Sequence, residues 1–197
     1  MQPTGCDDTT WARGCVNKIP FCKSLFTPTC DCASLRIEND YSLTALPDSL
    51  VDDMTGLRKL FIRNCNLTKL PPRMEQLTAM VEFEIFSNRL GAFDVDIRKW
   101  KKLDSLYLTY NKLRRFKHST LWTHKNLRYL DISDNIGMEL PDATTEISMP
   151  SLLFFGCCNN SVSVPIRFDK NRFPNLLDLY LSGNHLVKFP DSSLKEN

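Results

Sequence analysis

The chain has 197 residues, 42% of them hydrophobic, and a formal net charge of +2 at pH 7. This length and composition suffice for one substantial hydrophobic core. The longest apolar run, around residues 152–158, is much shorter than the roughly 18 residues of a membrane-spanning helix. The first residues, MQPTGCDDTTW, lack the apolar stretch of a secretory signal. We therefore expect neither a membrane span nor a secretory signal within this sequence.

Residues 1–31 differ from the rest of the chain because they hold four of its eight cysteines. Disulfides, a structural zinc site and free thiols are the alternatives for Cys6, Cys15, Cys22 and Cys30. The long spacings and the lack of a nearby His argue against zinc, and the density of cysteines favours disulfides. Four cysteines allow three pairings, and all three stay open. We predict a small cysteine-rich domain with disulfides among these four residues.

A sequence pattern repeats along residues 32–190. Its clearest copy is residues 103–116, LDSLYLTYNKLRRF, which reads L-x-x-L-x-L-x-x-N-x-L-x-x-F. The other full copies begin at Leu57, Met80, Leu127, Leu152 and Leu176, so that successive copies start 23, 23, 24, 25 and 24 residues apart. A degenerate copy begins at Cys32, where a buried thiol can replace Leu. Self-similarity at this period predicts a solenoid of about seven repeats.

The pattern predicts one short strand followed by a turn in each repeat. Leu106 and Leu108 alternate with polar residues, so we expect the apolar side chains to face a core and the others to point outward. Asn111 then turns the chain, and its amide can bond backbone groups of adjacent repeats. Stacked repeats share one core. The predicted fold is an α/β solenoid with a parallel sheet on one side and returning segments on the convex side.

The remaining cysteines and two glycosylation sequons lie within the repeats. Cys65 replaces the turn Asn and Cys157 occupies a core position of its strand, so both are predicted to be buried, inert thiols. Cys158 should point outward, and the strain of a vicinal disulfide disfavours its pairing with Cys157. Asn66 (NLT) and Asn159 (NNS) begin sequons at the edge between strand and turn, so we predict glycosylation at both. Together with the cysteine-rich start, the sequons favour an extracellular or cell-surface location over a cytoplasmic one.

The basic residues concentrate in one segment. Residues 98–128 contain ten Lys or Arg and one acidic residue, a net charge of +9, whereas the rest of the chain carries −7. Such a segment can bind anionic polymers or headgroups. However, its cations precede and follow one predicted strand, which favours an ordinary solvated surface. Because no interleaved aromatic platform accompanies these charges, we predict no nucleic-acid partner.

The sequence offers no catalytic pattern. Its three histidines, His118, His124 and His185, fall on separate repeats, and His124 takes a position at which neighbouring repeats have Trp or Met, so we expect it to be partly buried. Hydrolase, zinc-protease and phosphate-binding motifs are lacking. We therefore predict a protein that is not an enzyme and that uses no metal and no cofactor.

Aromatic and acidic residues occupy many outward positions of the predicted strands. The core does not need them there, and aromatic anchors among a few charges are typical of protein-binding surfaces. The alternative is that aromatic residues simply suit strands and cover one another. We predict that the partner-binding residues are Phe61, Glu82, Glu84, Phe86, Tyr107, Tyr129, Asp131, Phe154 and Tyr180.

Residues 32–190 resemble a leucine-rich repeat domain. The recurring signature, the Leu-Pro pairs at 46–47, 70–71 and 140–141, and the period resemble plant-like and receptor-type repeats, and the cysteine-rich start resembles the N-terminal cap of extracellular members. The resemblance implies a right-handed horseshoe whose concave sheet recognises a protein or peptide. It also implies that this chain is part of a larger receptor-like protein, and that only this larger protein associates with a membrane. The expected organisation is a cap at 1–31 and repeats over 32–197, the last continuing into a truncated or uncapped end.

Two other functions remain open from the sequence. The first is a cytosolic leucine-rich repeat scaffold in signalling, with reduced cysteines and unmodified sequons. The second is binding of anionic glycans or lipid headgroups through residues 98–128, with affinity that salt weakens.

Overall fold

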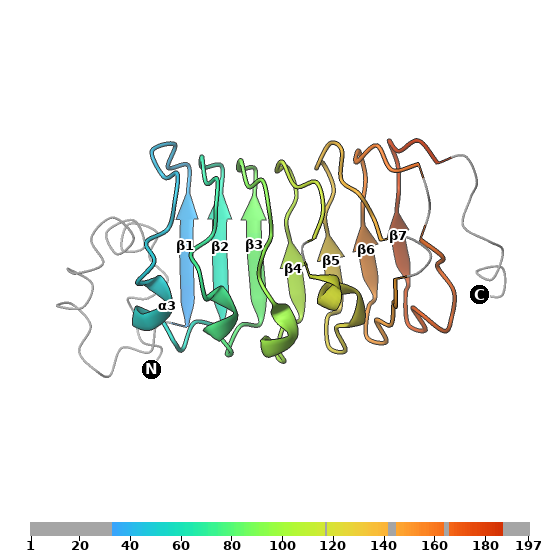
Figure 1. The fold of residues 1–197 in the computed structure, drawn as a ribbon, viewed down its shortest axis with the longest axis horizontal. Coiled ribbons are helices and arrows are strands. Elements are labelled where there is room, and N and C mark those ends of the chain that lie inside the picture. Colours follow the sequence, from blue (N-terminus) through green and yellow to red (C-terminus); the bar gives the residue numbers. More distant parts are fainter. Residues whose placement is uncertain (1–32, 117, 142–144, 164–165, 187–197) are drawn as a thin grey trace.

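The computed structural model describes residues 33–116, 118–141, 145–163 and 166–186 (Figure 1). The predicted cap with Cys6, Cys15, Cys22 and Cys30 lies outside these ranges. Among the described residues, no helix has the length and apolar character needed to cross a bilayer.

One strand from each of the seven predicted repeats joins a single parallel sheet in chain order (Figure 1). The strands are β1 (Ser34–Glu38), β2 (Lys59–Arg63), β3 (Glu82–Phe86), β4 (Ser105–Tyr107), β5 (Tyr129–Asp131), β6 (Phe154–Gly156) and β7 (Asp178–Tyr180). They pair in register through one row of core residues, Leu35, Leu60, Phe83, Leu106, Leu130, Phe155 and Leu179. The predicted α/β solenoid of seven repeats is therefore confirmed.

Short helical turns return the chain from one strand to the next. They are α3 (Leu50–Asp53) and the 3-10 turns η1 (Met74–Gln76), η2 (Ile97–Lys99) and η3 (Ser119–Thr123). A period of 23 to 25 residues leaves room for only one turn of helix per repeat. Met74, Ile97 and Trp100 bury their side chains in the core. The Trp100 indole N–H donates to the Met74 carbonyl at 3.1 Å, which satisfies the polar atom of this buried ring.

Aromatic rings connect the repeats inside the core. Phe83 contacts Phe93, which contacts Phe116, and the row continues through Trp122 to Phe155, with successive centroids 5.8, 6.0, 6.0 and 6.2 Å apart. Every one of these pairs is close to edge-to-face, the arrangement that aromatic quadrupoles favour. The row extends the shared core from β3 to β6.

The turn asparagines form the predicted ladder. They are Asn88, Asn111, Asn135, Asn160 and Asn184. In Asn111, for example, the side-chain oxygen accepts from the Leu90 N–H at 3.1 Å, and the amide donates to the Ile85 carbonyl at 2.7 Å. Each ladder side chain thus links its own repeat to the preceding one. Cys65, in the place of an Asn, is buried, and its thiol donates to the Arg63 carbonyl.

The residue before each ladder position adopts a left-handed backbone, which the sequence pattern does not reveal. In five of the seven repeats this residue is Asn, Asp or Gly, which adopt this conformation most readily: Asn39, Asn64, Asp134, Asn159 and Gly183. In a sixth repeat it is Ser87. Tyr110 is the exception, with φ of 54°. Its ring is 53% exposed and contacts Phe86 edge-on at 5.4 Å.

Candidate functional site on the open face of the sheet

Outward side chains of the strands form the open face, the side of the sheet opposite the core. Because the strands pair in register, these side chains stand in rows across the sheet. One row is Ser34, Lys59, Glu82, Ser105, Tyr129, Phe154 and Asp178, and the next is Arg36, Phe61, Glu84, Tyr107, Asp131, Gly156 and Tyr180. The face divides into two halves with different chemistry.

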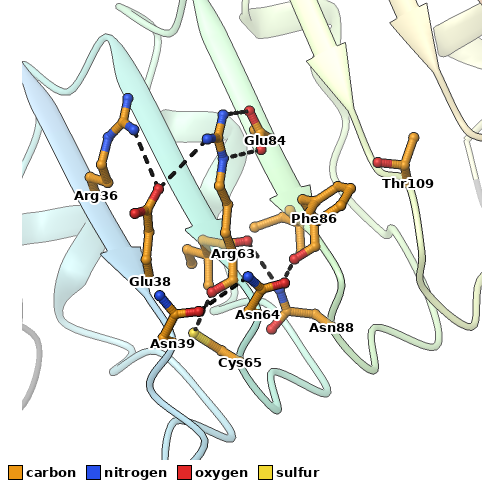
Figure 2. A network of polar contacts seen from close by, with 12 residues as sticks. Arg36, Glu38, Asn39, Arg63, Asn64, Cys65, Glu84, Phe86, Asn88 and Thr109 are labelled. Carbon is orange, nitrogen blue, oxygen red and sulfur yellow. Dashed lines mark hydrogen bonds and ion pairs between the residues drawn. The ribbon is translucent and has the colours of Figure 1, made fainter.

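On β1 to β3 the open face is occupied by ion pairs. Arg63 makes a two-pronged hydrogen bond with Glu84, one prong of 2.6 Å, and lies 3.6 Å from Glu38 (Figure 2). Arg36 also contacts Glu38, at 3.3 Å, and Lys59 pairs with Glu82 at 3.2 Å. Two-pronged pairs of this kind are the strongest polar contacts available to arginine. The hydrogen bond from Arg63 to Glu84 raises the pKa of the guanidinium, which therefore stays charged.

The same arginines cover the ring of Phe61. The Arg36 guanidinium carbon lies 4.6 Å from the ring centroid and that of Arg63 lies 5.8 Å from it. Phe61 is only 5% exposed and Glu84 only 8%. Of the residues predicted to contact a partner, these two are thus sheltered by the chain's own arginines, while Glu82 is half-buried in its ion pair.

On β4 to β7 the open face carries aromatic rings, of which Tyr129 has the Arg128 guanidinium carbon 5.4 Å from its ring centroid. Tyr107, Tyr129 and Phe154 are half-buried, and Tyr180 is 52% exposed. The rings of Phe154 and Tyr180 lie 5.3 Å apart. Burial raises the pKa of the Tyr107 hydroxyl, so that this group stays protonated and able to donate a hydrogen bond. Among the outward positions of these four strands, all of which are described, none holds Lys or Arg.

Two carboxylates accompany these rings. The Asp131 Oδ1 atom accepts from the Ser133 N–H at 3.0 Å, and a Cβ built on Gly156 would come within 2.6 Å of the same oxygen. The glycine therefore lets the carboxylate lie over β6. Asp178 is exposed at the start of β7. Within the described ranges neither carboxylate forms an ion pair.

We call this half of the face the aromatic–acidic surface: Tyr107, Tyr129, Asp131, Phe154, Asp178 and Tyr180. Phe86 lies apart from it, half-buried beside Tyr110. Sequence reasoning missed the cover that Arg36 and Arg63 give to Phe61. The sequence feature that could have indicated this cover is the alternation of basic and acidic residues at matching positions of the first three repeats.

His124 and Cys157 are buried and contact neighbouring groups of the core. His124 is buried, its Nδ1 accepts from the Leu127 N–H at 3.1 Å, and its Nε2 therefore carries the proton and donates to the Trp100 carbonyl at 3.2 Å. Burial lowers the pKa of this imidazole and raises that of the Cys157 thiol to about 11. Cys157 and Cys158 are free thiols. In the part of the chain that the structure describes, no three His, Cys, Asp or Glu residues are grouped so as to hold a metal ion.

The predicted glycosylation sites lie away from this surface, and the cations of the basic segment flank its strands. The Asn66 amide donates to the Tyr41 carbonyl at 2.6 Å, and the exposed Asn159 donates to Asp134 at 2.9 Å, both beyond the ends of the strands. The cations of residues 98–102 precede β4 and those of residues 112–115 follow it, so the segment does not form one continuous patch on the sheet.

Comparison with known proteins shows the fold. No protein-family model matches the sequence, and no curated protein matches it. Among solved structures, TLR13 in its complex with ssRNA13 gives a TM-score of 0.62 at 20% identity over 78% of this chain and 22% of that chain. The internalin inlF from Listeria monocytogenes gives 0.43 at 18% identity, over 82% of this chain and 65% of that one.

The leucine-rich repeat ectodomain of the plant membrane receptor kinase GASSHO1/SCHENGEN3 from Arabidopsis thaliana, in complex with CASPARIAN STRIP INTEGRITY FACTOR 2, gives a TM-score of 0.45 at 21% identity, over 76% of this chain and 24% of that one. The present chain spans about a fifth of the TLR13 chain and just under two thirds of the internalin chain. The sheet topology and the likeness to TLR13 show that this chain has the leucine-rich repeat fold.

Proposed function

We propose that the protein is a non-catalytic recognition module that binds a protein or peptide through the aromatic–acidic surface. The observation that carries this proposal is the contrast within the open face. Phe61 is covered by two of the chain's own arginines, and Tyr129 is approached by Arg128 alone, whereas the strands that carry Tyr107, Phe154 and Tyr180 hold no Lys or Arg at an outward position.

The size and chemistry of the surface support this function. Neighbouring strands lie about 4.8 Å apart, so β4 to β7 span roughly 14 Å, which four or five residues of an extended peptide can cover. Tyrosine is well suited to an interface because its rigid ring offers apolar area and its hydroxyl offers a hydrogen bond. The core row behind the surface, including Leu106, Leu130 and Phe155, is fully buried, which holds the outward residues in place.

Other kinds of ligand fit this surface less well. Asp131 and Asp178 would repel nucleic-acid phosphates, so the absence of a nucleic-acid partner remains part of the proposal. An anionic glycan or a lipid headgroup would need cations gathered on one surface, and those of residues 98–128 lie before and after β4. The proposal therefore keeps a protein or peptide as the partner.

We also propose an extracellular or cell-surface location for this module, as part of a larger receptor-like protein. The cysteine density of residues 1–31 and the two sequons support this location. The test is the intact mass of the natively produced protein, before and after reduction and deglycosylation. Glycan at Asn66 or Asn159 with disulfides among the four N-terminal cysteines is expected. Eight free thiols and no glycan would make the cytosolic scaffold the better account.

Peptide selection tests the recognition function. A display library of random peptides is selected against the full chain, and the affinity of each selected peptide is measured for wild type and variants. Tyr129→Ala and Tyr107→Ala should each weaken binding about tenfold or more, equivalent to roughly 1.4 kcal/mol or more. Tyr41→Ala is the matched control, because Tyr41 is an exposed tyrosine in the turn after β1.

The variants must remain folded for this comparison to be valid, which the unfolding midpoint followed by circular dichroism shows. Selected peptides whose affinity falls as much with Tyr41→Ala as with Tyr129→Ala would contradict the proposal. A selection in which no peptide loses affinity when Tyr107 or Tyr129 is replaced by Ala would also contradict the proposal.

A further inference from the structure

The chain itself shows what kind of group its open face accommodates. At β1 to β3, the Arg63 guanidinium lies against the Phe61 ring. The carboxylates of Glu84 and Glu38 hold the same guanidinium (Figure 2). The Arg36 guanidinium covers the same ring from a shorter distance. A planar cation thus satisfies an aromatic ring and neighbouring carboxylates together, through cation–π attraction and hydrogen bonds.

The aromatic–acidic surface contains the same ring and carboxylate partners but lacks the cation. In the row that contains Phe61 and Glu84, the later repeats place Tyr107, Asp131 and Tyr180. The adjacent row adds Tyr129, Phe154 and Asp178. Among all these outward positions there is no Lys or Arg, and within the described ranges neither aspartate forms an ion pair.

A third arginine shows that a guanidinium also fits these rings. Arg128, just before β5, places its guanidinium carbon 5.4 Å from the centroid of the Tyr129 ring. The same side chain lies 3.4 Å from Asp104, beyond the strand end. Arg128 approaches the Tyr129 ring from the edge of the surface. The carboxylates of Asp131 and Asp178 therefore remain available to another cation.

We propose that the partner is an extended segment of a protein that presents arginine side chains to the aromatic–acidic surface, where their guanidinium groups lie over the rings and pair with Asp131 and Asp178. This inference rests on the proposed function and names the chemistry of its ligand. The guanidinium would repeat on β4 to β7 the contacts that Arg63 makes on β2 and β3. Arginine suits the surface better than lysine because its planar group stacks on rings and forms two-pronged hydrogen bonds with carboxylates.

Asp131 is positioned to bind and orient the guanidinium group of the partner. Its Oδ1 atom is held by the Ser133 N–H, and Gly156 leaves room for the carboxylate above β6, between the rings of the neighbouring strands. A carboxylate fixed in this way loses little conformational entropy when it binds a cation. Asp178 stands two strands further along and provides a second contact for the same segment.

The test uses four synthetic peptides of equal length, with capped ends, in which every second residue is Arg, Lys, citrulline or Glu. Citrulline has nearly the shape of arginine without its charge, so it isolates the effect of the cation. Binding to the full chain is followed by fluorescence anisotropy at two salt concentrations. The Arg peptide should bind about tenfold or more tightly than the citrulline peptide, with Lys between them and Glu weakest. Higher salt should weaken binding of the Arg peptide, because the pairs are partly exposed to solvent.

The double variant Asp131→Asn, Asp178→Asn should weaken binding of the Arg peptide roughly three- to tenfold, as expected for two partly exposed charge pairs. Asn keeps the side-chain oxygen that accepts from Ser133. The matched control is Asp48→Asn, which removes an exposed charge away from the strands and should leave affinity unchanged. Equal binding of the Arg and citrulline peptides, or unchanged binding to the double variant, would overturn the inference.

The outcomes separate this inference from the proposed function. Library-selected peptides that depend on Tyr129 but contain no Arg would overturn the arginine inference and leave the recognition function in place. Selected peptides that are insensitive to every open-face variant, together with an Arg peptide that does not bind, would overturn both. A single-stranded nucleic acid that binds more tightly than the Arg peptide and is displaced by open-face variants would also overturn both.

Discussion

Asn135 gives the most quantitative test of the ladder that joins the repeats. Its side chain is fully buried. The Oδ1 atom accepts from the Leu113 N–H at 3.0 Å, and the amide donates to the carbonyls of Leu108 and Ile132, both at 2.9 Å. In Asn135→Ala, the buried Leu113 N–H loses this acceptor at a cost of roughly 1–3 kcal/mol, and each lost bond to a carbonyl adds about 0.5–1.5 kcal/mol. We expect a loss of about 2–6 kcal/mol in the free energy of unfolding.

The assay is urea unfolding followed by tryptophan fluorescence, because Trp100 and Trp122 are buried in the two repeats that precede the repeat of Asn135. Asn126→Ala is the control. Asn126 is exposed, and its amide makes one hydrogen bond of 2.6 Å to the Lys101 carbonyl, so its removal should cost about 1 kcal/mol or less. If Asn135→Ala were as stable as Asn126→Ala, the ladder would not join the repeats as described.

Three further predictions test packing, titration and the open face. Leu106→Ala should cost roughly 2–5 kcal/mol of unfolding free energy, since Leu106 is fully buried, and a midpoint near wild type would contradict the register. Because burial lowers the pKa of His124 below the ordinary histidine value of 6.5, the unfolded chain binds the proton more readily. The stabilisation from neutral His124 is complete above pH 6.5 and is lost as the pH falls below it, so the stability of His124→Gln should fall less steeply than that of wild type over that range. Gly156→Ala should cost about 1–3 kcal/mol because its Cβ would meet the Asp131 carboxylate, and the added change Asp131→Ala should restore part of the loss, whereas simple additivity would refute the contact.

The fold was predictable because the residues that define it recur at a nearly constant spacing along the sequence. Leu106, Leu130 and the equivalent residues recur at one position of every repeat, and a parallel sheet in register turns that recurrence into a row of buried contacts. The asparagine ladder followed from the same periodicity. The left-handed backbone before each ladder residue was not predictable in this way, because Asn, Asp, Ser, Gly and Tyr share no side-chain pattern at that position.

The open face was only partly predictable. Alternation identified which side chains point outward, including Tyr107, Tyr129 and Tyr180. It could not show that Arg36 and Arg63 bend over Phe61, since this depends on side-chain conformation and on the separation of neighbouring strands. The sequence therefore predicted one set of partner-binding residues, and the structure divides the face into a half occupied by ion pairs and a half whose outward positions hold no Lys or Arg.

Photo-cross-linking tests the central claim most directly. Tyr129, on the open face of β5, is replaced by the photoreactive amino acid benzoylphenylalanine, and the same replacement is made separately at Lys99, an exposed residue of η2 on the opposite side of the core. Each protein is irradiated with a peptide selected against the wild-type chain, and the products are mapped by mass spectrometry. The account predicts cross-links from position 129 and none above background from position 99. Cross-links from position 99 alone would show that the peptide binds the other side of the solenoid.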